Sequence, residues 1–267
     1  MLPPTSDDGA VVVTGASSGI GEQIAREFAR RGYRLVLVAR RADRLRNLAE
    51  ELNGPAHVLP TDLSDRDERA TLPDQVAALG VVTDVLINNA GLATVGPVAE
   101  SDPQSELNLI EVDVAAVVDL CSRFVPGMVG RGRGAVLNVA SVGAFGPLPG
   151  QASYGAAKAF VLSYTQAMRE ELRGTGVTAS ALCPGPVRTA FGDKAGMPRE
   201  EAESALPNFM WTEADEVARA AVDGLAADKA VIIPGLPNRI GSVLYHLAPR
   251  RLLLPLLARQ HPGLKKT

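Results

Sequence analysis

Cysteine is scarce in this sequence. Among 267 residues there are two cysteines, Cys121 and Cys183, and three histidines. The two cysteines lie in apolar surroundings, far apart in the sequence, and their spacing matches neither a disulfide framework nor a metal-binding motif. We therefore expect two buried free thiols, as in a protein of the reducing cytoplasm, and no metal centre.

Positive charge and long apolar runs are scarce as well. The 27 lysines and arginines are outnumbered by 30 aspartates and glutamates, which gives a formal net charge of -3 and no overall basic field for nucleic acid. No run of eighteen apolar residues is available to span a bilayer. Residues 1–9 are acidic and contain proline, whereas a secretory signal has a basic flank and an apolar run. We expect a cytoplasmic protein with no nucleic-acid partner.

Short apolar runs alternate with amphipathic helical patterns along most of the chain. Strands are expected over residues 10–14, 35–39, 56–60, 85–88, 136–139, 177–182 and 230–233. Helices are expected after the first strand and over residues 42–52, 65–79, 105–128, 151–173 and 213–227. This alternation predicts right-handed crossovers and a doubly wound α/β fold, a parallel sheet of about seven strands with helices on both faces. The length suits one Rossmann-type domain over residues 1–267.

The two longest helical patterns also predict self-association. Residues 105–128 and 151–173 are expected to present apolar faces beyond what one subunit can bury. Most soluble oligomers contain identical subunits, so we expect a homodimer or a homotetramer built on these helices.

A glycine-rich turn follows the first strand and precedes a helix. Glycines there admit a pyrophosphate close to the backbone, and the helix N-terminus attracts its negative charge. The turn therefore predicts a dinucleotide site, although a tight strand-to-helix turn without a ligand is the alternative. The cofactor contacts expected from this turn are Gly15, Ser17, Ser18, Gly19, Ile20 and Gly21.

The end of the second strand indicates which dinucleotide is bound. The common fingerprint places an acid there against the ribose 2′-hydroxyl, whereas this sequence has Ala39, Arg40 and Arg41. Guanidinium groups suit a 2′-phosphate that an acid would repel. We therefore expect NADP rather than NAD, with Arg40 the better candidate, unless both arginines are solvated residues at a helix start. After the third strand, Asp62 is placed either to hydrogen-bond the adenine amino group or to cap the next helix.

Residues 141–158 contain the groups expected to carry the chemistry. Tyr154 and Lys158 are four residues apart, so in a helix the ammonium lies beside the phenol. The cation favours the phenolate and lowers the tyrosine pKa from about 10 towards values useful for a base. Ser141 follows a β-branched run that predicts a buried strand. Tyrosine and lysine also occur four apart by chance, so this assignment depends on the cofactor site.

Two further segments differ from the rest of the chain. Residues 190–212 contain glycine, proline, methionine and aromatic residues without clean periodicity, which is typical of a mobile lid over an apolar substrate. Residues 238–267 have six basic residues and no acid, interleaved with leucines. This basic amphipathic tail can lie on an anionic membrane surface or cover an apolar pocket, and packing on its own fold or on a partner subunit is favoured over membrane contact. Pro249 and Pro255 are expected to break it.

The motifs occur together in one order, and from about residue 10 to residue 233 the chain resembles the short-chain dehydrogenase/reductase family. They are Thr14-Gly15-Ala16-Ser17-Ser18-Gly19-Ile20-Gly21, Asn88-Asn89-Ala90-Gly91, Ser141, Tyr154 with Lys158, and Pro184-Gly185. The resemblance implies that Tyr154 is the acid/base on the substrate oxygen, that Ser141 hydrogen-bonds this oxygen, and that Lys158 lowers the tyrosine pKa and holds the nicotinamide ribose. The remaining cofactor contacts are assigned to Asp62, Leu63, Asn89, Ala90, Gly91, Tyr154, Lys158, Pro184, Gly185, Val187 and Thr189.

One position departs from the family pattern. Family members usually carry an asparagine in the long helix before the catalytic strand, where it is thought to hold a water that links the lysine to solvent. Here the segment is Val112-Asp113-Val114-Ala115-Ala116. Asp113 accepts hydrogen bonds but cannot donate as an amide does, and it adds a negative charge. We expect Asp113 to act as a fourth catalytic residue, with the proton relay persisting in altered form.

The sequence thus predicts an NADP-dependent oxidoreductase that interconverts a secondary alcohol and a ketone by hydride transfer. The apolar lid and tail favour a lipophilic substrate such as a lipid or a steroid, and acyl-chain or quinone-like carbonyls are the runner-up class. The alternative from outside the enzymes is an NADPH-binding sensor or scaffold with vestigial catalysis. Asp113 is the only feature that favours this alternative.

Overall fold

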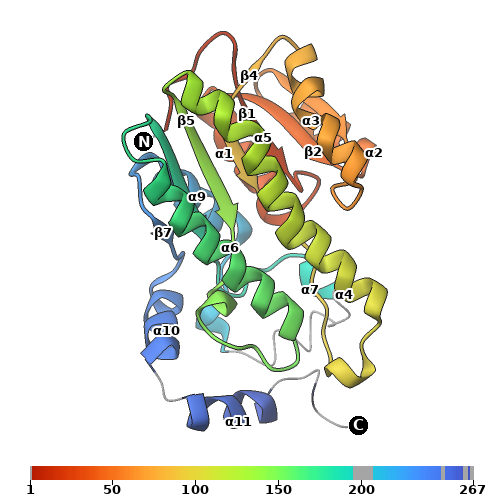
Figure 1. Cartoon of the computed structure of the whole chain (residues 1–267), viewed down its shortest axis with the longest axis vertical. Coiled ribbons are helices and arrows are strands. Elements are labelled where there is room, and N and C mark those ends of the chain that lie inside the picture. Colours follow the sequence, from red (N-terminus) through yellow and green to blue (C-terminus); the bar gives the residue numbers. More distant parts are fainter. Residues whose placement is uncertain (1, 195–206, 248–249, 261–263, 265–267) are drawn as a thin grey trace.

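The computed structural model describes residues 2–194, 207–247, 250–260 and 264. At its centre is a sheet of seven parallel strands in the order β3-β2-β1-β4-β5-β6-β7 (Figure 1). The strands are β1 (Gly9–Thr14), β2 (Arg34–Ala39), β3 (Ala56–Pro60), β4 (Val82–Asn88), β5 (Gly134–Val139), β6 (Val177–Leu182) and β7 (Val231–Ile232). The order reverses between β1 and β4, which is where doubly wound sheets form their ligand crevice. The expected doubly wound α/β fold is confirmed.

Both faces of the sheet are apolar, because successive side chains of each strand point to opposite faces and both sets are hydrophobic. Val11 and Val13 belong to one core, whereas Val12 belongs to the other. The first core is covered by α1 (Gly19–Arg30), α2 (Ala42–Glu51) and α9 (Ala214–Ala226). The second is covered by α3 (Arg66–Ala78), α5 (Ala116–Gly130) and α6 (Ala152–Glu171), of which α5 and α6 cross in front of the sheet in Figure 1. Cys121 and Cys183 are buried free thiols in this second core, as expected.

The long helix expected over residues 105–128 is divided by a π-helical turn. It consists of α4 (Pro103–Ile110), a π turn (Glu111–Ala115) and α5. A π turn adds a residue to the helix without ending it and is frequent at functional sites. The spacing of hydrophobic residues in the sequence did not indicate this π turn. The turn rotates the apolar face of the helix, but no glycine or proline marks its position.

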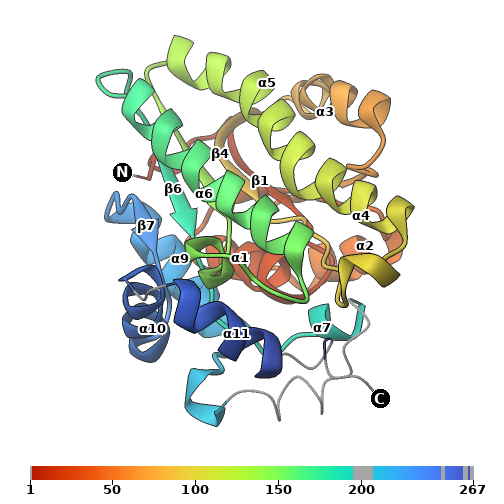
Figure 2. The same ribbon diagram turned by 60° about the horizontal axis from the view of Figure 1, so that its bottom comes forward.

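The carboxyl ends of the strands are covered by two helices that follow β7. They are α10 (Leu236–Leu247) and α11 (Arg250–Gln260), and Figure 2 shows both at the end of the molecule that also carries α7 (Phe191–Lys194). The prediction that Pro255 breaks this segment is wrong, because α11 continues through it. Pro255 is exposed, so solvent can satisfy the carbonyl that loses its partner. Pro249 lies outside the described residues. Among the described helices none is long and apolar enough to cross a bilayer.

Candidate active site

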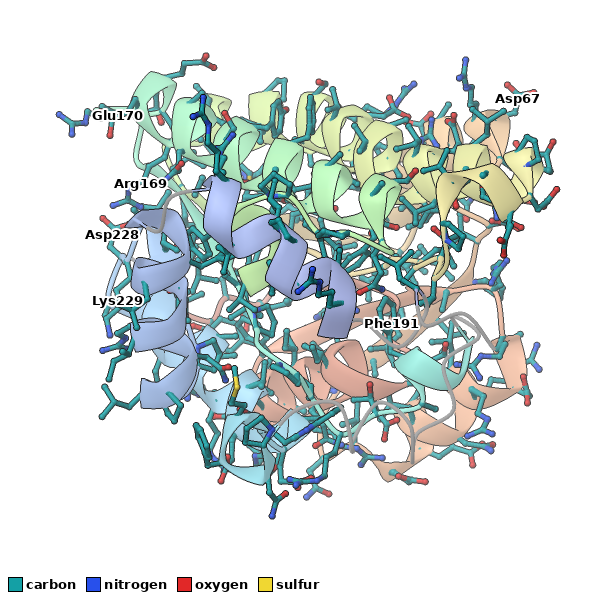
Figure 3. The ribbon with its side chains drawn as sticks, turned by 90° about the horizontal axis from the view of Figure 1, so that it is seen from below. Asp67, Arg169, Glu170, Phe191, Asp228 and Lys229 are labelled. Carbon is teal, nitrogen blue, oxygen red and sulfur yellow. The ribbon has the colours of Figure 1, made fainter. Side chains whose placement is uncertain are left out.

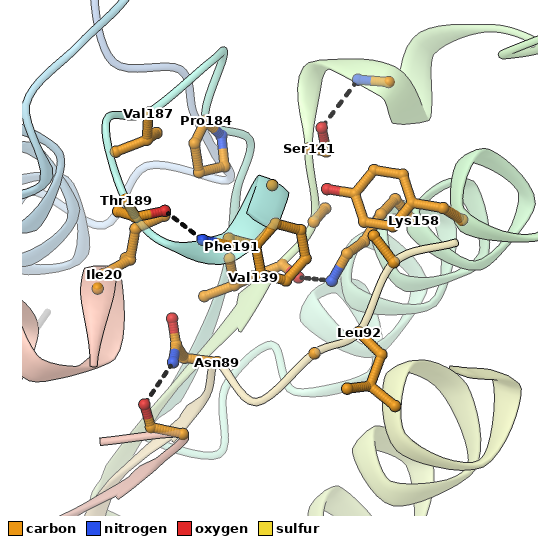
Figure 4. Close-up of a pocket in the computed structure, with 18 of the residues that line it drawn as sticks. Ile20, Asn89, Leu92, Val139, Ser141, Lys158, Pro184, Val187, Thr189 and Phe191 are labelled. Carbon is orange, nitrogen blue, oxygen red and sulfur yellow. Dashed lines mark hydrogen bonds between the residues drawn. The ribbon is translucent and has the colours of Figure 1, made fainter. Parts of the chain in front are cut away.

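A cleft of about 700 Å³ opens at the carboxyl ends of the strands (Figure 4). Its walls come from residues as far apart in the sequence as Gly15 and Leu257. Every cofactor contact expected from the sequence lines this cleft except Gly21, and Ser141 lines it as well. Asp113 does not line the cleft, because its side chain is fully buried behind it.

Two glycines allow the first turn to pack against the loop that follows β4. Gly15 has φ of 65°, and a Cβ there would lie 2.7 Å from Asn89 Nδ2. A Cβ on Gly21 would lie 2.5 Å from the Gly15 carbonyl oxygen. Larger residues would therefore force the turn away from the strand ends. Because Gly21 does not line the cleft, it shapes the turn from behind.

The loop after β4 is fastened to β1 by Thr14 and Asn89. The Thr14 hydroxyl donates to the Ile87 carbonyl at 3.1 Å and accepts from the backbone N–H groups of Asn89 and Ala90 at 2.9 and 3.1 Å. Asn89 Nδ2 donates to the Thr14 carbonyl at 2.9 Å. These bonds fix the two sides of the crevice relative to each other, so Asn89 holds the cleft together as well as lining it.

The two arginines after β2 are placed differently. Arg41 Nη2 donates to the hydroxyls of Ser17 and Ser18, each at 2.9 Å, so its guanidinium lies over the glycine turn. The Arg40 side chain is 62% exposed and lies 3.9 Å from Asp62 Oδ2. The sequence favoured Arg40, but Arg41 is the arginine that hydrogen bonds hold beside the turn. Together these side chains offer forked and hydroxyl donors of the kind that phosphate oxygens accept.

Asp62 does not cap the following helix. Asp65 caps α3 instead, since its carboxylate accepts from the backbone N–H of Asp67 at 2.8 Å. Asp62 Oδ1 accepts from the backbone N–H and the hydroxyl of Ser64, at 3.0 and 2.7 Å. Burial raises the pKa of Asp62, but the Ser64 bonds and the charge of Arg40 outweigh this effect and lower it overall. The carboxylate is therefore ionised at the cleft wall, where it can accept a hydrogen bond from an amino group.

Three predicted catalytic groups meet at the end of β5. Tyr154 and Lys158 lie in the first half of α6, with Lys158 Nζ 5.7 Å from the centroid of the Tyr154 ring. Ser141, which begins the turn after β5, lies beside Tyr154, and its hydroxyl accepts from the Gly143 backbone N–H at 3.1 Å. Lys158 Nζ also donates to the Val139 carbonyl at 3.0 Å. Figure 4 shows Ser141 and Lys158 on the same side of the cleft.

Asp113 forms an ion pair with Lys158. Its Oδ2 lies 2.9 Å from Lys158 Nζ, and its Oδ1 accepts from the Leu92 backbone N–H at 2.7 Å. Gly91 makes room for this pair, because a Cβ there would lie 3.1 Å from Asp113 Oδ2. An asparagine in this position would keep the bond from Leu92 but would place a neutral amide against the ammonium.

The charges of this pair set the titration of the site. Burial is the largest effect on Tyr154 and raises its pKa. The Lys158 ammonium and the Ser141 hydroxyl lower this pKa, and the Asp113 carboxylate raises it again. The net shift is upward, so the expected lowering of the tyrosine pKa is wrong in its overall direction. Burial is the largest effect on Lys158 and lowers its pKa, but the Asp113 carboxylate and Tyr154 together outweigh burial and raise the pKa overall. At neutral pH the site therefore holds a phenol beside an ammonium, which suits donation of a proton.

Part of the apolar lining of the cleft comes from segments after residue 189. Phe191, Met210, Trp211, Tyr245 and Leu257 line this part of the cleft. The ring centroids of Phe191 and Tyr154 are 6.2 Å apart. Seen from below, α11 crosses this end of the molecule, with Phe191 near one of its ends (Figure 3). The C-terminal segment thus covers an apolar pocket, which was one of the alternatives that the sequence left open.

One side of α10 faces the cleft, which the sequence did not predict. Asn238, Gly241, Ser242 and Tyr245 line the cleft. Spaced by three, one and three residues, they form one small or polar helix face. The sequence shows this periodicity but not which surface the face covers. Tyr245 also fastens α10 to the catalytic loop: its hydroxyl donates to the Pro147 carbonyl, and its ring occupies the space that a Cβ on Gly146 would need.

The two ends of the expected lid, residues 190–212, are held together. The Thr212 backbone N–H donates to the Pro186 carbonyl at 3.0 Å, and the Arg188 N–H donates to the Thr212 carbonyl at 3.1 Å. The Arg188 guanidinium donates to Glu213 Oε1 at 2.8 Å and also to Asn208. Residues 195–206 of the expected lid lie outside the described part of the chain.

Comparison with known proteins identifies the family. A family model for short chain dehydrogenases matches residues 9–199. The chain belongs to the short-chain dehydrogenase/reductase family. A short chain dehydrogenase of Pseudocercospora fijiensis is 38% identical over 187 residues, which cover 68% of this chain and 60% of that relative.

Two solved structures of the family are similar over almost the whole chain. A short-chain dehydrogenase from Sphingobium yanoikuyae in complex with NADPH has a TM-score of 0.77 and 33% identity, with 94% of each chain covered. The bulky-bulky ketone specific alcohol dehydrogenase from Comamonas testosteroni has a TM-score of 0.73 and 30% identity, with 94% of this chain and 92% of that chain covered. This short-chain dehydrogenase/reductase is therefore an oxidoreductase of alcohol and carbonyl groups.

Proposed function

We propose that the protein uses NADPH to interconvert a ketone and a secondary alcohol on a lipophilic substrate. The observation that carries the proposal is the meeting of Ser141, Tyr154 and Lys158 in a cleft that also contains the glycine turn. NADPH occupies the similar structure from Sphingobium yanoikuyae. Arg40 and Arg41, which take the place of an acid at the end of β2, support the phosphorylated cofactor here.

The cleft fits a dinucleotide with a 2′-phosphate. The glycine turn leaves no side chain in the way at the start of α1, where backbone N–H groups favour a pyrophosphate. Arg41 Nη2 and the hydroxyls of Ser17 and Ser18 form one cluster of donors beside the turn. When bound, NADPH supplies the hydride that reduces a carbonyl carbon.

Tyr154 donates the proton in this mechanism. Its raised pKa keeps the phenol protonated, so the O–H group is available as negative charge develops on the carbonyl oxygen. The Ser141 hydroxyl donates a second hydrogen bond to the same oxygen. The Lys158 ammonium, which Asp113 keeps charged, stabilises the phenolate left after transfer. We assign the return of a proton to Tyr154 to a relay through Lys158 in which Asp113 takes the place of the usual asparagine.

The walls of the cleft favour an apolar substrate. Phe191, Met210, Trp211 and Leu257 surround the space beyond Tyr154, and burying apolar substrate surface against them stabilises the complex by about 25 cal/mol per Å². A lipid-like or steroid-like ketone matches this lining, as does an acyl-chain or quinone-like carbonyl. We further propose that residues 190–212 act as a lid within one domain spanning residues 1–267.

Consumption of NADPH with a panel of lipophilic ketones tests the proposal. We expect turnover with NADPH, and we expect Tyr154→Phe to lose about 10²- to 10⁴-fold in kcat while its affinity for NADPH stays within twofold, since the phenol supplies a proton and not the binding site. Mass analysis of small molecules that copurify with the protein would narrow the substrate class. Tight NADPH binding without turnover on any carbonyl would instead establish a sensor or scaffold module.

Self-association is proposed through the helices that flank the second core. Leu107 and Ile110 on α4 are 64% and 38% exposed, and Phe160 on α6 is 42% exposed. Large apolar side chains gathered on neighbouring helices are a frequent mark of subunit contacts, which favours a homodimer or a homotetramer. Location in the cytoplasm stays a prediction from the sequence.

A further inference from the structure

Helix α10 has a second face, which is apolar and points away from the cleft. Leu236, Ile240 and Leu244 follow one another at intervals of four residues and are 67%, 53% and 62% exposed. Phe209, in the short helix η4 (Asn208–Met210) that packs against α10, is 70% exposed. One helix therefore has a face on the substrate cleft and, on its opposite side, a stripe of large apolar side chains in contact with solvent.

The apolar stripe belongs to a segment of the chain that is rich in exposed arginines. Arg239 on α10 and Arg250, Arg251 and Arg259 on α11 are all exposed. Residues 238–267 contain no aspartate or glutamate, whereas the chain as a whole has a net charge of -3. The C-terminal segment is thus a basic surface on an otherwise acidic protein. Apolar side chains flanked by arginines are the composition of helices that lie in the plane of a membrane surface.

We propose that the outer face of α10, together with the exposed arginines of α11, docks on an anionic lipid surface. In that arrangement the helices that close the cleft lie against the membrane, since Tyr245 on α10 and Leu257 on α11 line the cleft. A lipophilic carbonyl compound dissolved in the bilayer then reaches the cleft without crossing water. This last step rests on the proposed function, whereas the docking itself does not.

A lipid surface fits this face better than a second copy or another protein. Two copies joined through the same stripe would bring Arg239, Arg250 and Arg251 close to their own counterparts, and like charges facing each other are unfavourable. A stable protein interface buries about 800 Å² on each partner, much more than a few side chains of one helix can supply. Anionic headgroups, by contrast, neutralise every exposed arginine while the acyl boundary accepts the leucines.

Cosedimentation of the full chain with vesicles tests the docking. The probes are phosphatidylcholine vesicles and vesicles in which one third of the lipid is phosphatidylglycerol. We expect at least about tenfold stronger partitioning into the anionic vesicles, weakening as salt is added. The variant Leu236→Ser/Ile240→Ser/Leu244→Ser should lose most of this binding, and Arg250→Ser/Arg251→Ser/Arg259→Ser should lose about fivefold for each arginine removed.

Control variants remove an exposed apolar side chain, or three exposed arginines, from other parts of the surface. Val98→Ser removes a side chain that is 70% exposed, and Arg46→Ser/Arg173→Ser/Arg219→Ser removes three exposed arginines. These variants should bind vesicles within twofold of the unaltered protein. All five proteins should consume NADPH equally with a water-soluble ketone, because none of the altered residues lines the cleft.

Several outcomes would overturn the proposal. The first is equal binding to anionic and phosphatidylcholine vesicles. The second is a loss of vesicle binding in the control variants as large as in the α10 and α11 variants. The third is a loss of binding in the arginine variant alone, which would mean that the protein adsorbs by charge without inserting apolar side chains. A fall in molecular mass of the leucine variant in lipid-free solution would assign the face to a second copy. Vesicle binding without any carbonyl turnover would leave the docking surface standing and refute the proposed function.

Discussion

Asp113 gives the catalytic centre an additional buried charge. Its carboxylate is 2.9 Å from Lys158 Nζ with the side chain fully buried, so the ammonium is paired before any cofactor or substrate arrives. The positive charge of Lys158 favours the Tyr154 phenolate, and the negative charge of Asp113 cancels part of this effect. The same charge keeps Lys158 protonated in spite of its burial. The centre is thus biased towards a protonated tyrosine, the form needed to reduce a carbonyl.

Asp113→Asn should move the pH dependence of both reaction directions to lower pH. Removing the carboxylate removes one of the effects that raise the Tyr154 pKa, so the phenol ionises at lower pH. Ketone reduction, which needs the phenol, should decline at lower pH than in the unaltered protein, and alcohol oxidation, which needs the phenolate, should rise at lower pH. Profiles of kcat against pH in both directions measure this. Unchanged profiles would remove any special role for the carboxylate.

Arg41 is the residue on which the cofactor preference is expected to depend most. Arg41→Ala removes a guanidinium that bonds two serine hydroxyls beside the glycine turn. Loss of a charge-assisted contact to the 2′-phosphate should lower kcat/KM for NADPH by about 10- to 100-fold and change the value for NADH little. Steady-state kinetics with both cofactors check this, and Arg46→Ala, an exposed arginine on α2, is the control. An equal loss with NADH would show that Arg41 only supports the turn.

At the scale of elements, the π turn places Asp113 and is itself held by a buried arginine. Arg69 on α3 is 4% exposed and donates to Glu111 at 3.0 Å, to Asp119 at 2.8 Å and to the Leu63 carbonyl at 2.7 Å. Glu111 begins the π turn, and Asp119 lies in the first turn of α5. One guanidinium therefore clamps the helix on both sides of the irregular turn, which fixes the direction in which Asp113 points.

Arg69→Met should destabilise the protein and disturb catalysis together. It leaves two carboxylates without their buried partner, and because both are partly exposed we expect a loss of about 2–3 kcal/mol rather than the larger cost of breaking a fully buried pair. Urea unfolding measures the loss, and kcat should fall as the turn relaxes. Arg66→Met is the control, since Arg66 pairs with the same Glu111 from the surface and should change stability little. Equal effects of the two variants would refute the clamp.

The sequence specified the regular elements well and the irregular ones poorly. The limits of β3 and β6 agree with the expected strands. Short apolar runs bounded by turn residues usually form buried strands when the fold is a parallel sheet. The π turn at residues 111–115 escaped notice because it depends on tertiary contacts such as those of Arg69. Asp62 was equally ambiguous, since a strand-end carboxylate can cap a helix or bond a nearby turn, and only the three-dimensional position of Ser64 decides between them.

At the scale of the whole molecule, the part of the cleft that contains the glycine turn and the proposed catalytic groups could be predicted from the sequence more completely than the part proposed to bind the substrate. The glycine turn, Ser141, Tyr154 and Lys158 were brought together as expected, because each follows a strand at the same edge of the sheet. The contributions of Tyr245 and Leu257 could not be derived. They depend on the path by which α10 and α11 return over that edge, which local sequence patterns do not encode.

Subunit assembly provides a further test at this scale. Leu107→Asp/Phe160→Asp places charge on two exposed apolar positions of α4 and α6 and should reduce the oligomer to smaller species. Light scattering coupled to gel filtration measures the mass, and Val98→Asp, at another exposed apolar position, should leave it unchanged. An unaltered protein that is monomeric, or a mass unaffected by the double variant, would exclude these helices as the contact.

The arrangement of the cleft along the chain has a consequence for how such an enzyme can change. Ser141, Tyr154, Lys158 and the glycine turn all precede residue 190, and the match to the family model ends at residue 199. Part of the apolar lining follows residue 189, and Phe191, Met210 and Trp211 enter through a segment whose ends Arg188 and Thr212 hold side by side. Substitutions in the lining segments after residue 189 can therefore change which substrates fit, in evolution or by design, while the groups assigned to the reaction stay in place.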